Sequence, residues 1–215
     1  MTRRIFTVAF FDFDGVIVES AGIKVQAFLD CLPSEPPAVR DAIREYATRH
    51  GGVSRFGKFR YIHERILARP LTADALDQLC ERYRCLVLEQ VERAPFVPGA
   101  RELLEAIHQT TDCYVVSGTP QDELREIVKG RGLADFFKEV VGSPATKTTL
   151  IEGIARRYAR RDHMVFIGDT ITDLDAARET GLAFLGVAAG ADRGGLPAEV
   201  EITSDLSAYR PRFSS

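Results

Sequence analysis

The segment that most constrains this chain is V-A-F-F-D-F-D-G-V-I-V-E-S, which spans residues 8–20. It opens with a short apolar run rich in aromatic side chains, which predicts a buried strand rather than a helical turn. Asp12 and Asp14 stand at its carboxyl end, where they repel each other unless a cation lies between them. Gly15 then allows a sharp turn or the close approach of a ligand. The segment indicates a metal-assisted site at the mouth of a parallel sheet, and the alternative is a pair of carboxylates that begin a polar loop.

The composition narrows the class of protein. The 215 residues, 45% hydrophobic and 27% charged, suit one large domain or one domain with an inserted subdomain. A net charge of −3 gives no electrostatic reason to expect nucleic acid or an anionic membrane as a partner. The four cysteines include no C-x-x-C pair, and no apolar run is long enough to cross a bilayer. We therefore expect a cytoplasmic protein with reduced thiols, as a monomer or a homodimer.

The pattern of strands and helices predicts two parts. Residues 1–17 and 93–215 are expected to form a three-layer, Rossmann-like α/β core around a parallel sheet, because short strands there alternate with helices. Residues 18–92 show no convincing strand, which predicts an inserted α-helical cap. Its helices are expected at residues 21–32, 38–49, 59–67 and 72–91. Further strands of the core are expected at residues 113–116, 136–141, 163–167, 182–187 and 201–203.

Polar residues follow other predicted strands besides the first. In open parallel sheets the ligand lies beyond the carboxyl ends of the strands, so these residues are expected to meet Asp12 and Asp14. Ser117, Gly118 and Thr119 end one strand and open a helix. A hydroxyl and backbone N–H groups at such a junction suit phosphate oxygens, although an ordinary helix cap gives the same pattern.

Two further elements supply charge at the same edge. Lys147, in G-S-P-A-T-K, can neutralise a phosphate and a carboxylate nucleophile, although most lysines are surface residues. Asp169 follows a strand directly and can ligate Mg²⁺, which takes a few carboxylates and keeps several waters. Asp173 lies near the start of the next helix, where it is either a ligand, a support for one, or a helix cap.

These groups together describe a phosphoryl-transfer site. A carboxylate such as Asp12 can attack phosphorus directly and form an aspartyl-phosphate, which water then hydrolyses. Asp14, two residues on, can protonate the leaving oxygen and later activate the water. The predicted cofactor is Mg²⁺, and the predicted partner is a small phosphorylated metabolite.

The order D-F-D-G-V, V-V-S-G-T, Lys147 and G-D-T-I-T-D resembles the four motifs of the haloacid dehalogenase-like (HAD) hydrolases. The resemblance covers essentially the whole chain and implies a Rossmann-like core, Mg²⁺ and an aspartyl-phosphate intermediate. It implies that Asp12 is the nucleophile, that Asp14 is the acid and base, and that Ser117 and Lys147 hold the phosphoryl group. It also implies that Asp12, the backbone carbonyl of Asp14, and Asp169 hold the metal, with Asp173 assisting.

The helical insert resembles the cap of the phosphoglycolate phosphatase and β-phosphoglucomutase branch of that family. Its G-V-S-R segment places Arg55, with Lys58 and Lys24, where cations can hold an anionic part of the substrate remote from the scissile phosphate. The alternative is that these cations are solvated. The mutase pattern expects a histidine where this chain has Lys24, so a phosphatase is favoured and a phosphosugar mutase is the alternative. A non-catalytic binding module is disfavoured because Asp12, Asp14 and Asp169 are all present.

Overall fold

The computed structural model describes residues 5–188, 193 and 195–213. Its centre is a sheet of parallel strands in the order β3-β2-β1-β4-β5-β6. The strands are β1 (Val8–Phe11), β2 (Asp112–Pro120), β3 (Glu139–Ser143), β4 (Met164–Gly168), β5 (Ala183–Val187) and β6 (Ile202–Thr203). The prediction of a three-layer, Rossmann-like α/β core is confirmed by this parallel order and by the helices between the strands.

The helices fall between the strands and in one long block after β1. They are α1 (Ala21–Cys31), α2 (Pro37–Arg49), α3 (Arg55–Tyr61), α4 (Ala73–Arg93), α5 (Ala100–Ile107), α6 (Gln121–Gly130), α7 (Lys147–Ala155) and α8 (Ile171–Thr180). Shorter turns are η1 (Ile62–Ile66), η2 (Ala134–Phe136), η3 (Arg161–His163) and η4 (Leu206–Arg212). In the part of the chain that the structure describes, no helix has the length and apolar character needed to span a bilayer.

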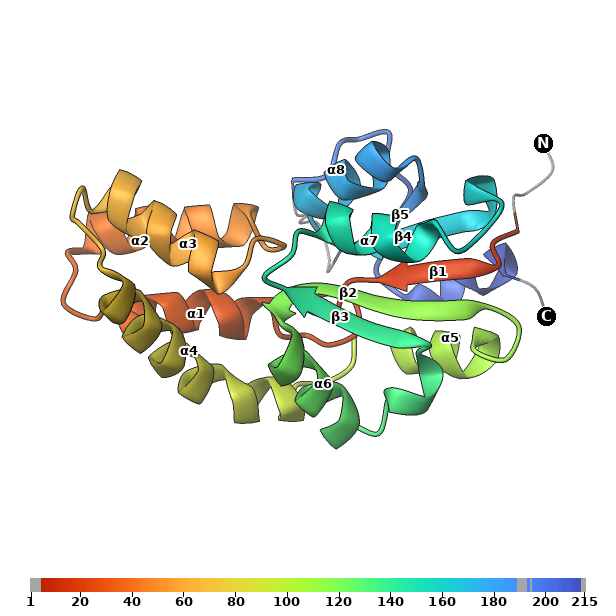
Figure 1. Ribbon diagram of the computed structural model, residues 1–215, viewed down its shortest axis with the longest axis horizontal. Helices are drawn as coiled ribbons and strands as arrows, with labels where there is room; N and C mark the ends of the chain where they lie inside the picture. The colour runs from red at the N-terminus through yellow and green to blue at the C-terminus, as the bar shows by residue number, and fades with distance from the viewer. Residues whose placement is uncertain (1–4, 189–192, 194, 214–215) are drawn as a thin grey trace.

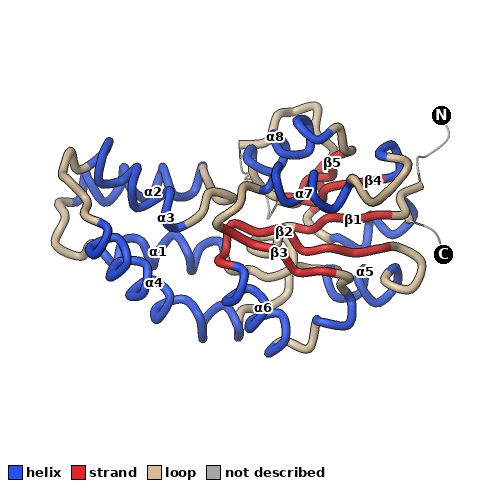
Figure 2. Tube along the Cα trace, viewed as in Figure 1, coloured by secondary structure: helices blue, strands red, loops and turns tan. Residues whose placement is uncertain are grey.

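The central strands send alternate side chains into two apolar layers. Val8 and Phe10 of β1 pack in the layer that contains buried residues of α7 and α8. Ala9 and Phe11 point to the opposite face and pack in the layer that contains α5 and α6. Figure 2 shows the strands between these two sets of helices. The central strands β1 and β4 are therefore buried on both faces, as their nearly continuous apolar sequences require.

Residues 21–93, from α1 through α4, form a group of helices that we call the helical unit. It lies beyond the carboxyl ends of the strands, and the arrowheads of β1 and β3 point toward it in Figure 1. Two connecting segments join it to the core and pair with each other. The backbone N–H of Glu19 donates to Pro95 O at 2.9 Å, and that of Val97 donates to Ile17 O at 3.0 Å. The helical unit is thus placed over the edge of the sheet where the predicted site residues lie.

The helix expected at residues 59–67 differs from the prediction at both ends. It begins earlier, at Arg55, because the Ser54 hydroxyl accepts a hydrogen bond from the backbone N–H of Gly57 at 3.3 Å and caps the helix. It then passes into the π-helical turn η1. Arg55 therefore lies on the first turn of a helix and not on a connecting loop.

The second strand is longer than predicted. The sequence pattern indicated residues 113–116, but β2 continues to Pro120, which pairs with Ser143 of β3 after a shift in register. The S-G-T-P sequence is typical of a turn, yet the neighbouring strand gives its backbone a partner. Ser117 and Thr119 consequently lie in the last part of a strand, not beyond its end.

Candidate active site

Three carboxylates gather at the carboxyl ends of β1 and β4. Asp12 directly follows β1, Asp169 directly follows β4, and Asp173 lies in the first turn of α8. One oxygen atom from each carboxylate lies within 4.8 Å of the other two. Oδ1 of Asp169 is buried and has no hydrogen-bond partner among the described residues. Carboxylate oxygens so close together, one of them unsatisfied, fit a hard divalent cation such as Mg²⁺.

The electrostatics of this cluster support the same interpretation. Burial raises the pKa of Asp12 from 3.8 to about 7, even though Lys147 acts in the opposite direction. Burial, together with Asp173 and Asp12, raises the pKa of Asp169 well above its ordinary value. A cation among these carboxylates would stabilise their ionised forms and lower their pKa values.

Lys147 is the positive charge of the core site. It is the first residue of α7, and the preceding Thr146 caps that helix by accepting a hydrogen bond from the backbone of Thr149. Its Nζ lies 2.8 Å from Asp12 Oδ2 and 2.5 Å from Asp173 Oδ1. The side chain is buried, and the two carboxylates outweigh the effect of burial and raise its pKa. Lys147 is therefore a fixed cation beside Asp12, not a surface residue.

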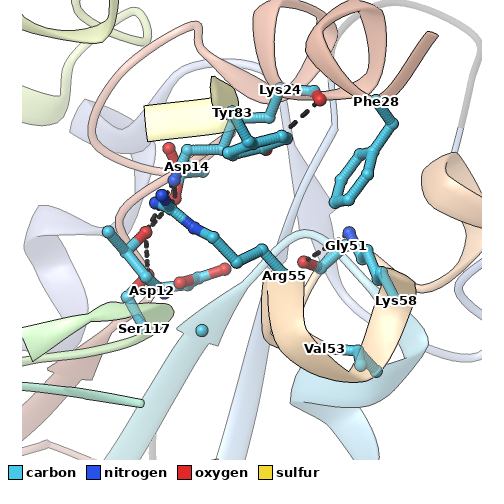
Figure 3. A pocket seen from close by; sticks show the side chains of 12 residues that line it. Asp12, Asp14, Lys24, Phe28, Gly51, Val53, Arg55, Lys58, Tyr83 and Ser117 are labelled. Atoms are coloured by element: carbon cyan, nitrogen blue, oxygen red, sulfur yellow. Dashed lines mark hydrogen bonds and ion pairs between the residues drawn. The ribbon is translucent and has the colours of Figure 1, made fainter. Parts of the chain in front are cut away.

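Asp12 is held at both carboxylate oxygens. Its Oδ1 accepts a hydrogen bond of 2.7 Å from the backbone N–H of Phe13, and its Oδ2 pairs with Lys147. The side chain is only 4% exposed, and it lines the pocket shown in Figure 3. These contacts fix the orientation of the group that the sequence predicted as the nucleophile.

Asp14 has a different environment, although it lies only two residues away. Its Oδ1 accepts from the Ser20 hydroxyl at 2.6 Å, and its Oδ2 accepts from Lys24 Nζ at 2.5 Å and from the Thr119 hydroxyl at 3.2 Å. Burial alone would raise the pKa of Asp14, but Lys24 and Ser20 outweigh it and lower this pKa. The two aspartates thus have pKa values displaced in opposite directions, as expected for groups with different chemical roles.

The end of β2 supplies hydroxyl groups to the same pocket. The Ser117 hydroxyl donates to Thr119 Oγ1 at 3.2 Å and accepts from the backbone N–H of Thr119 at 3.1 Å. Gly118 approaches the helical unit so closely that a Cβ there would lie 2.6 Å from the carbonyl oxygen of Gly52. This close approach explains why glycine is needed at residue 118.

The helical unit contributes cations to the pocket, as the sequence predicted. Lys24, Arg55 and Lys58 all line it. The Arg55 guanidinium is buried, lies 4.7 Å from the centre of the Tyr83 ring and pairs with Glu123 of α6 at 2.5 Å. The structure does not place Arg55 on an exposed loop; it places it between the helical unit and the core.

Two hollows meet at the site. The first has a volume of about 30 Å³, room for a water molecule or two, and lies under Arg55, Phe28 and Tyr83. The second is a groove of about 710 Å³ that also reaches Asp169. Both are lined by Asp12, Asp14, Lys24, Gly51 and Lys58. A ligand that enters the groove therefore meets the carboxylates of the core and the lysines of the helical unit together.

The sequence matches a known family over most of its length. Residues 9–187 match the model of the haloacid dehalogenase-like hydrolases. The chain belongs to this family. In this chain Asp12 directly follows β1, Ser117 lies in β2, Lys147 opens α7 and Asp169 directly follows β4.

Curated relatives and solved structures agree with this membership. A phosphoglycolate phosphatase of Vibrio vulnificus (strain YJ016) is 27% identical over 104 residues, which are 45% of this chain and 46% of the relative. The chain thus matches about half the length of that relative. A phosphoglycolate phosphatase of Pseudomonas putida is 23% identical over 94% of this chain and 77% of its own length.

Among solved structures, a predicted phosphoglycolate phosphatase of Haemophilus somnus has a TM-score of 0.73, with 21% identity over 96% of both chains. The β-phosphoglucomutase of Clostridium difficile has a TM-score of 0.76, with 14% identity over 95% of this chain and 93% of its own. These two structures show that the hydrolase shares their fold.

The structure brings together all the residues that the sequence singled out in this hydrolase. Most line the two hollows, while Lys147 and Asp173 lie behind Asp12 and contact it directly or through each other. Three neighbours were missed: Ser20, Tyr83 and Glu123. Ser20 precedes α1 in the sequence and would be expected to cap it, but its hydroxyl bonds Asp14 instead. Tyr83 and Glu123 carry no local pattern that sets them apart from other helical residues.

Proposed function

We propose that this haloacid dehalogenase-like hydrolase is a phosphatase that acts on a small phosphorylated metabolite through an aspartyl-phosphate on Asp12. The observation that carries the proposal is the fixed Asp12 carboxylate, held by the Phe13 N–H and Lys147 Nζ at the carboxyl end of β1. Asp14, the second carboxylate that such chemistry needs, lines the same pocket. The phosphoglycolate phosphatases among its relatives support the same class of reaction.

The metal site of the proposed enzyme is formed by Asp12, Asp169 and the backbone carbonyl of Asp14, with Asp173 in support. The clustered carboxylate oxygens and the unsatisfied Oδ1 of Asp169 support this assignment. Mg²⁺, when bound, supplies positive charge that offsets the charge of the phosphoryl group and of the carboxylates around it.

In the first step, a carboxylate oxygen of Asp12 forms a bond to phosphorus while the bond from phosphorus to the ester oxygen breaks. Lys147 offsets the negative charge of Asp12 and of the phosphoryl oxygens, and the Ser117 hydroxyl with the backbone N–H of Gly118 holds those oxygens. Asp14 gives a proton to the leaving oxygen. The negative charge of the bound phosphate raises the pKa of Asp14 and thus favours the protonated form that this step requires.

In the second step, water attacks phosphorus, the bond to Asp12 breaks, and Asp14 takes the proton from the water. Lys24 and Ser20 lower the pKa of Asp14, which suits its role as the acceptor of that proton. The products are inorganic phosphate and the free Asp12 carboxylate. In a phosphosugar mutase, a second hydroxyl group of the sugar would replace the water. The mutase pattern expects a histidine at residue 24. This chain has Lys24 there, which pairs with Asp14, so we favour hydrolysis.

The proposal is tested by measuring phosphate release from an aryl phosphate with Mg²⁺. We expect Asp12→Asn to lower kcat by at least roughly a thousandfold, because an amide has nearly the same shape but cannot form the acyl phosphate. Asp135→Asn, an exposed aspartate in η2, is the matched control and should keep full activity. EDTA should abolish activity and Mg²⁺ should restore it, while Ca²⁺ should inhibit because its coordination is larger and looser. Near-normal turnover by Asp12→Asn would contradict nucleophilic catalysis, and full activity after complete chelation would contradict the metal.

A further inference from the structure

The cations that the helical unit sends into the pocket differ in their partners. Lys24 lies 2.5 Å from a carboxylate oxygen of Asp14, and Arg55 lies 2.5 Å from one of Glu123. Lys58 has no carboxylate within ion-pair distance among the residues that the structure describes. Its Nζ donates instead to the backbone carbonyl oxygens of Ala47 and Gly51, each at 3.2 Å. Among the described residues, Lys58 is therefore the buried cation of this site whose charge no carboxylate balances.

The environment of Lys58 makes this imbalance costly. Its side chain is buried, with 5% exposure, and its Nζ lies 5.4 Å from the centre of the Phe28 ring. A buried charge without a counter-charge is unfavourable, and burial together with Lys24 lowers the pKa of Lys58 to about 7. An ammonium group has three N–H donors, and the two carbonyl oxygens use two of them. The remaining donor is available to a ligand.

The position of Lys58 relative to the carboxylates is the second observation. Lys58 lines both the smaller hollow and the groove, as Asp12 and Asp14 do. In Figure 3, Lys58 and Gly51 lie on one side of the pocket, while Asp12, Asp14 and Ser117 lie on the other. A ligand whose one end reaches Asp12 can therefore place its other end near Lys58.

We propose that Lys58 binds a second anionic group of the substrate, a carboxylate or a further phosphate, while the scissile phosphate lies at Asp12. The inference rests on the proposed function for the scissile end only. It assigns the substrate to the class of small phosphate monoesters that carry another negative charge. Lys58 is then the residue of the helical unit that distinguishes such substrates from neutral ones.

Arg55 is less suited to this role in the structure described. An incoming anion would have to displace Glu123, whose carboxylate is as deeply buried as the guanidinium it pairs with. Such a displacement leaves a buried carboxylate without a partner, at a large cost. Lys24 is engaged with Asp14 in the same way. Binding at Lys58 requires no ion pair to break, because only carbonyl groups hold its Nζ.

The test compares two phosphate monoesters of equal length, phosphoglycolate and 2-hydroxyethyl phosphate, which differ in the carboxylate. The full chain with Mg²⁺ is expected to prefer phosphoglycolate, and Lys58→Met is expected to reduce kcat/KM for it by roughly tenfold to a hundredfold. The same variant should lower kcat/KM for 2-hydroxyethyl phosphate by a clearly smaller factor, so that the preference for phosphoglycolate falls. Lys138→Met, an exposed lysine beside Asp112, is the matched control and should alter neither. Lys58→Gln, which keeps hydrogen-bond donors but no charge, should behave as Lys58→Met does.

A binding measurement separates this inference from the proposed function. Phosphonoacetate, methylenebisphosphonate and ethylphosphonate cannot be hydrolysed at a phosphate ester, and their effect on the melting temperature reports binding without turnover. We expect phosphonoacetate or methylenebisphosphonate to stabilise the wild type more than ethylphosphonate does, and Lys58→Met to abolish the difference. The stronger of the two ligands identifies the second anion as a carboxylate or a phosphate.

Each outcome decides one of the two questions. Equal losses on both monoesters, or an unchanged preference in Lys58→Met, would overturn the role of Lys58 even if the aryl phosphate is hydrolysed. Loss of the binding difference in Lys58→Met, in a protein that hydrolyses no phosphate ester, would support the anion site and refute the phosphatase. If Lys58→Met does not fold, the preference of Lys58→Gln and of the wild type decides the matter in the same way.

Discussion

Asp12→Asn is expected to stabilise this protein against unfolding at pH 8 when no metal is present. In the folded protein, burial raises the pKa of Asp12 from 3.8 to about 7. A carboxyl group with a higher pKa in the folded state than in the unfolded state takes up a proton on folding between these two values. Its contribution to stability is therefore complete below about pH 4 and is lost as the pH rises through 7. Asparagine does not ionise, so the variant escapes this loss.

The expected magnitude follows from the pKa difference. Each pKa unit corresponds to about 1.4 kcal/mol, so the rise from 3.8 to about 7 places an upper limit of roughly 4 kcal/mol on the gain. This limit already includes the attraction of Lys147, which lowers the pKa of Asp12, and it is reached only if the asparagine packs as well as the protonated carboxyl group does. We therefore expect a net gain of roughly 1 to 3 kcal/mol at pH 8. For a domain of this size that corresponds to a rise of roughly 3 to 10 °C in melting temperature.

The assay is thermal unfolding of the wild type and Asp12→Asn in EDTA, followed by circular dichroism at several pH values from 4 to 8. The advantage of the variant should grow with pH and disappear near pH 4. Added Mg²⁺ should raise the melting temperature of the wild type more than that of the variant. The cation offsets the negative charge of Asp12 in the wild type, and the variant has no such charge. Asp135→Asn should follow the wild type throughout.

Two results would refute this reasoning. If Asp12→Asn melts below the wild type at pH 8 in EDTA, the ionised Asp12 carboxylate stabilises the folded protein. The negative charge of the acidic cluster then does not lower the free energy of unfolding. If the difference between the two proteins is the same at every pH, its cause is packing and not ionisation. Either result would also weaken the case for a cation among Asp12, Asp169 and Asp173.

Two further predictions concern the contact between the helical unit and the core. Gly118→Ala places a Cβ 2.6 Å from the Gly52 carbonyl oxygen, so kcat/KM should fall roughly tenfold or more on every substrate while the melting temperature changes little. Gly153→Ala, where a Cβ meets nothing within 4 Å, is its control and should keep full activity. Lys24→Met removes the cation that lowers the pKa of Asp14, so the acidic limb of the pH–rate profile for an aryl phosphate should move to higher pH. An unchanged limb would mean that Asp14 does not control that part of the profile.

Much of the core site could be predicted because its signals are local. Asp12 and Asp169 each follow an apolar strand directly, and parallel strands bring their carboxyl ends to one edge of a sheet. The fold class follows from the same alternation of strand and helix patterns. Ser117 was placed correctly at this edge even though β2 runs further than its apolar residues indicate.

The pairing of charged groups could not be predicted, because it depends on contacts between distant segments. Nothing near Lys147 in the sequence shows that two carboxylates surround it or that it is buried. The partner of Arg55 is Glu123, on α6 of the core. Ser54 caps a helix that begins at Arg55. The sequence pattern did not predict that start, because Gly57 is unfavourable inside a helix. The local pattern therefore identified Lys24, Arg55 and Lys58 but not which of these three has no carboxylate partner.

The distribution of these pairs bears on how substrate binding is linked to catalysis. When the helical unit lies over the core as it does here, Lys24 meets Asp14 and Arg55 meets Glu123, so each of these contacts favours the closed arrangement. In the same arrangement Lys58 is buried and has no carboxylate partner among the described residues. If the substrate carries the second anion proposed above, it supplies that charge only when both parts surround it. Binding energy from the remote group is then realised together with the alignment of the phosphate at Asp12, which is how a group that takes no part in the chemistry raises kcat. A substrate without the second anionic group lacks this contribution and should therefore have a lower kcat as well as a higher KM.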